Sequence, residues 1–485
     1  MRTERIETVV IGSGFGGAVA AARLVDSGVP VTLLERGPWR DTAPLANADL
    51  PSTAPLPSGR HFPTHVLRRA SIAGRTVNLH RDGLFDIHLQ RELSLVCSSG
   101  VGGGSHVYSA MNVRPAVAGF WGGHHEAVDD AVMEPHYRWI LSQMGSRPVA
   151  DMDTRVPNWI GSDNVPGWMT LDGVEQPALG LDPARGQFAR NSFFGSRDGN
   201  KVTLDERLLL PRLGKGLQVR DRHEVLDIAR TNEGLRLTVH DHGSGHRRVL
   251  LAGRVLLAAG TLNSLKLLFA SRARGSLCGM PALGLGIGGN GDVPAWWACR
   301  EPRRDYRAGP PSHGRFTLVD FDDCPDLTRY GFNGLPAPLS WMLRRDLVLV
   351  GMGADEANGL ARWHRGRLLF AYNGAANPVL ARIHRAFDEI SRRSGRPVRF
   401  LRHNPLTVHP LGGARMGQDL RTSVVNADGE VHGVPGLYVC DASALPAAPG
   451  SPPSMSIAAW AGHVATTLTQ ATTNLNANLE GGHAA

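Results

Sequence analysis

The chain has 485 residues, 42% hydrophobic and 20% charged, which is ordinary for a globular protein and enough for more than one domain-sized unit. Its formal net charge is +8, but the arginines are spread along the chain without interleaved aromatic residues, so the charge does not indicate nucleic-acid binding. The five cysteines include no Cys-x-x-Cys pair, which excludes a disulfide framework and a zinc site and favours the reducing cytoplasm.

The first predicted elements form a nucleotide-binding unit. A buried strand over residues 7–11 runs into the glycine-rich turn Gly12-Ser-Gly-Phe-Gly-Gly17 and an alanine-rich helix. In such a turn the first glycine permits the bend, the second lets the backbone approach a pyrophosphate, and the third lets the helix pack on the strand. The next strand, residues 31–34, ends in Glu35, where an acid meets the ribose hydroxyls. Glu35 disfavours NADP and leaves FAD and NAD open.

Further along, residues 39–93 contain scattered prolines, among them Pro51, Pro55, Pro57 and Pro63, and are expected to form a long irregular stretch. The motif Ser99-Gly-Val-Gly-Gly-Gly-Ser105 follows, and residues 255–264 indicate a strand, a glycine turn and a helix start. The carboxyl-terminal block contains His409-Pro-Leu-Gly-Gly413 and an apolar strand that ends in Asp441. An aspartate at that position is also favoured as a helix N-cap, which is a second explanation for Asp441.

Taken in order, these motifs resemble those of the glucose–methanol–choline (GMC) family of flavoproteins, and their sequences are most similar to those of its cholesterol-oxidase-like branch. The resemblance implies an α/β fold with a Rossmann-like FAD-binding domain of the GMC and p-hydroxybenzoate-hydroxylase type. A discontinuous substrate domain on a mainly antiparallel sheet would interrupt it. The expected FAD-binding domain comprises residues 1–115, 206–295 and 405–485, and the substrate-binding domain residues 116–205 and 296–404.

The resemblance also assigns the cofactor contacts. FAD would lie extended, with its adenine half on the first strand–helix–strand unit and its ring near the carboxyl-terminal motifs. His106 is one position out of register from a histidine that some members bond covalently to the flavin. The residues predicted to bind FAD are Gly12, Gly14, Phe15, Gly16, Gly17, Glu35, Gly103, Gly104, Ser105, Tyr108, Met111, Val225, Asp441, Ala442 and Ser454.

The implied reaction is the oxidation of an alcohol, with hydride passing to flavin N5 and a base taking the hydroxyl proton. A histidine suits the second task because its pKa lies near working pH, and the family places His409 at the reactive edge. The family's second polar residue, asparagine or histidine, falls on Pro452, which has no donor. Either Ser451, Ser454 or another residue replaces it, or the chain is a redox-neutral isomerase, lyase or cyclisation catalyst on the same fold.

The partners follow from the same resemblance. We expect a small hydrophobic substrate of sterol, terpenoid or polyketide type, and O₂ is a candidate electron acceptor. Trp296 and Trp297 fit either an apolar ligand pocket or the core of the substrate-domain sheet. No ligand spacing indicates a metal site, no apolar window is long enough for a transmembrane helix, and the first residues show no export signal.

Overall fold

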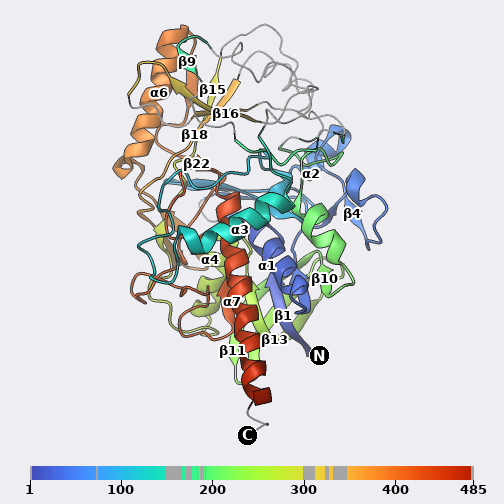
Figure 1. The fold of residues 1–485 in the computed structure, drawn as a ribbon. Coiled ribbons are helices and arrows are strands. Elements are labelled where there is room, and N and C mark those ends of the chain that lie inside the picture. The colour runs from blue at the N-terminus through green and yellow to red at the C-terminus, as the bar shows by residue number, and fades with distance from the viewer. Residues whose placement is uncertain are drawn as a thin grey trace.

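The computed structural model describes residues 3–72, 75–148, 166–170, 177–182, 184–185, 191, 193–298, 312–322, 327–330 and 347–481. Figure 1 shows a sheet with packed helices in its lower half, a second sheet at the top beside α6, and further strands between them. The middle of the expected substrate domain, including Cys299, Cys324 and most of residues 299–346, lies outside the described residues.

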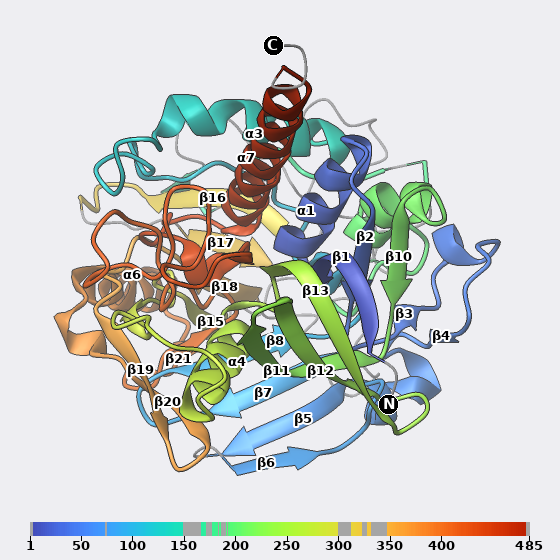
Figure 2. The same ribbon diagram turned by 90° about the horizontal axis from the view of Figure 1, so that it is seen from below.

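The first sheet has the strand order β10-β2-β1-β13-β12-β11, and β23 also pairs with β13 (Figure 2). The pairings of β1 with β2 and β13, of β2 with β10 and of β13 with β23 are parallel, whereas β11, β12 and β13 pair antiparallel. Val9 and Val10 are fully buried, as expected for a parallel strand that is covered on both faces. The bounds are β1 (Glu4–Ile11), β2 (Val31–Leu34), β10 (Leu217–Arg220), β11 (His223–Thr231), β12 (Gly234–Asp241), β13 (Arg247–Leu257) and β23 (Leu437–Val439).

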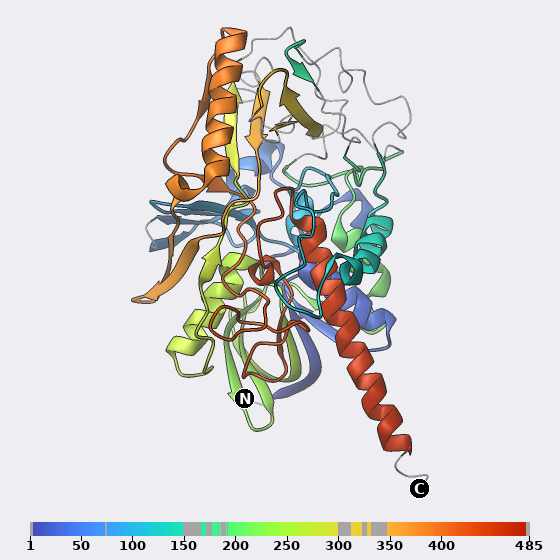
Figure 3. The same cartoon turned by 60° about the vertical axis from the view of Figure 1, so that its left-hand side comes forward.

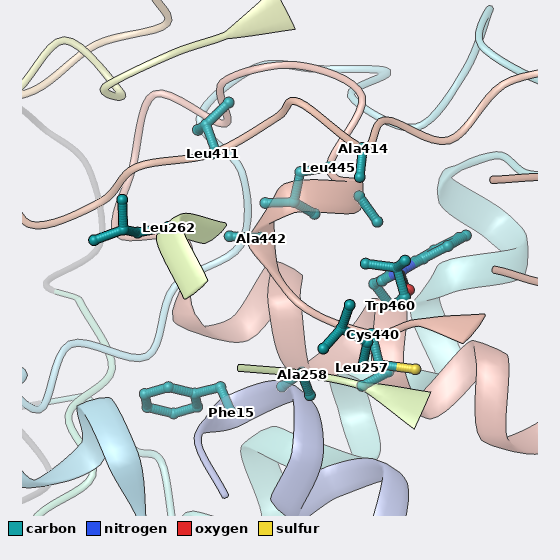
Figure 4. Close-up of a cluster of buried hydrophobic side chains, with 14 of the residues drawn as sticks. Phe15, Leu257, Ala258, Leu262, Leu411, Ala414, Cys440, Ala442, Leu445 and Trp460 are labelled. Carbon is teal, nitrogen blue, oxygen red and sulfur yellow. Dashed lines mark hydrogen bonds between the residues drawn. The ribbon is translucent and has the colours of Figure 1, made fainter. Parts of the chain in front are cut away.

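Small residues let the helices of this layer pack closely. Helix α1 (Phe15–Asp26) and helix α7 (Ser454–Gly481) meet through buried alanines, and α3 (Asp130–Gln143) packs on α7 (Figure 3). The Trp460 indole of α7 donates to the Val439 carbonyl at 2.9 Å and lies beside Cys440 in the apolar cluster of Figure 4. Helix α4 (Thr261–Ala273) packs against β11. The glycine turn after β1 is therefore held between a sheet and two helices.

The second sheet is entirely antiparallel in its described pairings and has the order β21-β15-β18-β17-β16-β9. Helix α6 (Pro378–Ser394) backs it, and the Trp297 indole donates to Ser394 on that helix at 3.2 Å. Side chains alternate along a strand, so Trp296 faces away from α6, as do Val348 and Val350 on the paired strand. Trp297 belongs to the sheet core and Trp296 to the opposite face. The bounds are β9 (Met169–Thr170), β15 (Val293–Trp297), β16 (Ser312–Leu318), β17 (Leu327–Tyr330), β18 (Leu347–Gly351) and β21 (Val398–Phe400).

The expectation of an irregular stretch over residues 39–93 was wrong. This segment supplies three strands of a five-stranded sheet, β22-β8-β7-β5-β6, which lies between the other two sheets (Figure 3). Arg69 on β5 pairs with Glu224 on β11 at 2.8 Å and joins this sheet to the first. The remaining bounds are β3 (Trp39–Arg40), β4 (Thr53–Ala54), α2 (Phe62–His65), β5 (Leu67–Ile72), β6 (Arg75–Asn78), β7 (Phe85–Leu89), β8 (Ser94–Ser98), β14 (Leu285–Ile287), β19 (Gly359–His364), β20 (Arg367–Ala371) and β22 (Leu406–Thr407).

Candidate active site

A cavity of about 850 Å³ runs from the glycine turn at the end of β1 to Val348 and Val350 on the inner face of the second sheet. Its position at the carboxyl ends of parallel strands is where ligands bind in open α/β sheets. Residues from all three sheets line it, so the cavity depends on the whole arrangement of the chain.

The glycines of the first turn have different steric roles, as their spacing predicts. A Cβ atom on Gly12 would lie 2.3 Å from the Ala258 carbonyl oxygen, and one on Gly17 would lie 1.9 Å from that of Gly12. A Cβ atom on Gly14 would meet only the Gly104 nitrogen, at 4.0 Å. Two of these glycines therefore allow close packing, and Gly14 leaves space open toward the cavity.

The second glycine turn, in the 3₁₀ segment Gly103–His106, touches the first, since a Cβ atom on Gly103 would lie 2.5 Å from the Gly14 Cα. Ser105 braces this turn from behind, donating to the Gly102 carbonyl at 2.7 Å and accepting from the Leu204 amide at 3.0 Å. His106 is buried, and its Nε2 lies 3.3 Å from the Asp205 carboxylate. The His106 ring thus points away from the cavity, which leaves no geometry here for a covalent link to a flavin.

The two predicted acidic residues, Glu35 and Asp441, differ in how many hydrogen-bond acceptor positions remain for a ligand. Glu35 accepts from the Ser13 amide at 3.1 Å, the Ser13 hydroxyl at 2.7 Å and the Gly37 amide at 2.9 Å. A carboxylate has about four acceptor positions, so Glu35 retains one for a ribose hydroxyl.

Asp441 has no such capacity. One of its oxygens accepts from the amide and hydroxyl of Ser443, as an N-cap does, and the other accepts from the Gly260 amide and the Ser264 hydroxyl. Burial raises the pKa of Asp441. Its side chain ties the end of β23 to the start of α4, and only its backbone is left to face the cavity.

These features fit an extended dinucleotide such as FAD. Glu35 offers an acceptor near the first turn, and Gly14 leaves room for a pyrophosphate beside the start of α1. Where α7 begins, the buried Ser454 hydroxyl lines the cavity and has no hydrogen-bond partner among the described residues. A buried hydroxyl without a partner is costly, so a ligand atom at this position would satisfy it.

His409 lines the cavity with its orientation set by a carboxylate. Its Nδ1 lies 2.9 Å from one oxygen of Asp292 and 3.0 Å from the other. Because an ionised carboxylate can only accept, Nδ1 carries the hydrogen and Nε2 is left with a free lone pair. Asp292 was not predicted from the sequence, in which it ends the glycine-rich stretch of residues 284–292. An acidic residue directly before an apolar strand was the signal that could have found it.

Pro452 and Pro453 also line the cavity, and neither carries a side-chain donor. The loop before them is held by Asn290, which donates to the Ser451 carbonyl at 2.9 Å and accepts from the Gly450 amide at 3.0 Å. The Ser451 hydroxyl donates to the Arg114 carbonyl at 2.8 Å. Ser451 is therefore engaged elsewhere, and Ser454 is the hydroxyl in this segment that remains for a ligand.

The cavity has an apolar and aromatic part. Phe85 and Phe194 line it with ring centroids 6.1 Å apart, and Phe62 packs on Phe194 at 5.4 Å. Tyr108 lines it with its ring, but its hydroxyl donates to the Val202 carbonyl at 2.8 Å. Burial raises the pKa of Tyr108 above its usual range, so this phenol stays protonated.

Most of the residues predicted from sequence share this one cavity. Gly17 and Ser105 stand behind it, in the packing roles described above. Across the described ranges, no group of three or more His, Cys, Asp and Glu side chains could hold a metal ion, and no helix has the length and apolarity to cross a membrane. The predicted residues in the cavity wall are Gly12, Gly14, Phe15, Gly16, Glu35, Gly103, Gly104, Tyr108, Met111, Val225, His409, Asp441, Ala442 and Ser454.

The chain is similar in sequence and in fold to known oxidoreductases. Residues 373–461 match the family described as GMC oxidoreductase, and residues 10–39 match an NAD(P)-binding Rossmann-like domain. A cholesterol oxidase of Mycobacterium tuberculosis is 28% identical over 94% of this chain and 89% of its own, and one of Acinetobacter baumannii is 22% identical over 93% and 92%. A formate oxidase structure from Aspergillus oryzae superposes with a TM-score of 0.60 at 15% identity, covering 98% of this chain and 100% of its own.

Proposed function

The chain belongs to the GMC oxidoreductase family, in its cholesterol-oxidase-like branch, and we propose that it dehydrogenates a hydrophobic alcohol with His409 as the base. FAD is its cofactor, and Glu35, Gly14 and Ser454 are the residues that would hold it. The observation that carries the proposal is the His409 ring in the cavity wall, held through Nδ1 with Nε2 free.

The residues act on the substrate in a simple order. FAD, when bound, supplies the acceptor for the hydride that leaves the alcohol carbon. His409 Nε2 takes the hydroxyl proton as the carbonyl forms, and so becomes an imidazolium. Val348 and Val350, on the second sheet, bury the apolar body of the substrate and keep water from the reacting carbon.

The aromatic and branched lining supports a substrate of sterol, terpenoid or polyketide type, because such a surface recognises a bulky apolar body and one polar group. We keep the two-domain division given above for the second sheet, whose strand β18 contributes Val348 and Val350 to the cavity wall, whereas α3 packs on α7 and lies with the FAD-binding domain. O₂ is the proposed acceptor of the electrons, and the free cysteines Cys97, Cys278 and Cys440 fit the cytoplasm.

The test is anaerobic addition of hydrophobic alcohols to the purified holoenzyme while the visible flavin band is recorded. We expect at least one sterol or terpenoid alcohol to bleach the band and yield the carbonyl compound. His409→Ala should retain FAD and lose the bleaching by a factor of about 100 or more. Conversion of substrate without bleaching would refute the dehydrogenase and support the redox-neutral isomerase or lyase that Pro452 suggests.

A further inference from the structure

We infer that Asp292 is a positioning residue for this reaction, and the inference rests on the proposed function. Its carboxylate holds the hydrogen of His409 on Nδ1 and stabilises the imidazolium that forms when Nε2 accepts the hydroxyl proton. One C–H bond and one O–H bond of the alcohol break. The hydride goes to FAD and the proton to Nε2, so the charge that develops on the ring lies beside a buried anion.

The surroundings of Asp292 show why its carboxylate is fixed. Its side chain is 2% exposed and lies where the glycine-rich stretch enters β15. The oxygen nearer His409 also accepts from the Thr407 hydroxyl at 2.8 Å and the Val408 amide at 3.1 Å. The His409 amide in turn donates to the Thr407 hydroxyl at 2.8 Å. The three consecutive residues 407–409 therefore hold one carboxylate in place, and turning the His409 ring would break its bond to that carboxylate.

Because position 452 is a proline, the contact between His409 and Asp292 is more important for orienting the proposed base. A second donor or acceptor is missing there, and the Ser451 hydroxyl is bonded to the Arg114 carbonyl. Within the described part of the chain, Asp292 is the charged group in contact with His409. A cation forming in a largely apolar cavity is strongly disfavoured unless an anion is close.

The test substitutes the carboxylate with an amide of the same shape. In Asp292→Asn, the amide can donate to Nδ1 and shift the hydrogen to Nε2, which removes the base. We expect anaerobic flavin reduction to slow by about 100-fold or more with little change in KM. The acid limb of the kcat/KM profile should move to lower pH, because the variant removes the anion that faces the imidazolium.

Asp355→Asn is the matched control. Asp355 is equally buried and braces the same glycine stretch, accepting from the Gly289 amide and the Tyr372 hydroxyl at 2.7 Å each, but it makes no bond to His409. This variant should lose stability without moving the pH profile. An equal shift in both variants, or none in Asp292→Asn, would overturn the inference.

A second measurement needs no change to Asp292. Nitrogen-15 NMR of histidine-labelled holoenzyme, with His409→Gln to identify the signal, should show a hydrogen on Nδ1 above the ring's pKa. A hydrogen on Nε2 would overturn the inference even if Asp292→Asn did not fold. If His409→Ala bleaches the flavin as fast as wild type, His409 is not the base, and that part of the proposed function fails together with the inference. If it does not and Asp292→Asn behaves as wild type, only the role of Asp292 fails.

Discussion

Two glycines of the first turn should respond oppositely to the same change. In Gly16→Ala the new Cβ atom would lie 1.9 Å from the Cys440 carbonyl oxygen, where contacts under 3.0 Å do not occur. In Gly14→Ala it would enter open space toward the cavity, with the Gly104 nitrogen 4.0 Å away. The Gly14 backbone, at φ −72° and ψ −164°, is extended and suits alanine. Gly16→Ala should therefore damage the fold, and Gly14→Ala the binding of FAD.

The magnitudes separate the two variants clearly. Relief of the Gly16 contact requires helix α1 and the end of β23 to move apart by about 1 Å, and overpacking of this kind costs about 1–3 kcal/mol or more. Alanine in a helix recovers about 1 kcal/mol of that. For Gly14→Ala, the stiffer unfolded chain adds about 0.5 kcal/mol to the stability of the apoprotein. A methyl group beside the pyrophosphate should weaken FAD binding about tenfold or more, which is about 1.4 kcal/mol.

Urea unfolding of the two apoproteins, followed by circular dichroism, gives the first quantity, and fluorescence titration with FAD gives the second. We expect a lower unfolding midpoint for Gly16→Ala only. Wild-type FAD affinity in Gly14→Ala would refute the placement of the pyrophosphate beside that glycine. A Gly16→Ala apoprotein as stable as wild type would refute the argument from the Cys440 contact.

Two further predictions concern stability and cofactor binding. Burial between α3 and α7 lowers the pKa of His136 from its ordinary 6.5 to about 4. The unfolded chain therefore binds a proton on this ring more readily than the folded chain does, and the free energy of unfolding falls as the pH drops from 6.5 to 4. The loss is about 2 kcal/mol after allowance for solvent screening. Urea midpoints should show a smaller acid loss in His136→Phe, and an equal loss would contradict the assignment. Ser454→Ala removes an unpartnered buried hydroxyl, so its apoprotein should be up to about 1 kcal/mol more stable while FAD binds several-fold more weakly in the same titration. A less stable apoprotein with unchanged FAD affinity would count against a ligand contact there.

The FAD-binding fold could be predicted from the sequence because its signals are local. The motifs at Gly12–Gly17 and Ser99–Ser105 carry turns whose glycines avoid close contacts, and Gly260 within residues 255–264 has a positive φ of 79° that suits glycine. The order of these motifs defines the topology. The sheet over residues 67–98 was missed for the converse reason. Its strands are short and prolines precede them, and the strands are stabilised by pairing with one another rather than by a motif within any single strand.

The site shows the same division between local and distant signals. His409 stands in a recognisable motif, whereas Asp292 lies 117 residues earlier, and only the pairing of the glycine stretch with the block around Thr407 brings the two side chains together. From the sequence alone, Pro452 suggested that the base had lost its partner. In the structure Asp292 contacts Nδ1 of His409, so the absence of a polar side chain at position 452 removes no bond that holds the ring. The base that we propose therefore does not need the second polar residue for its orientation.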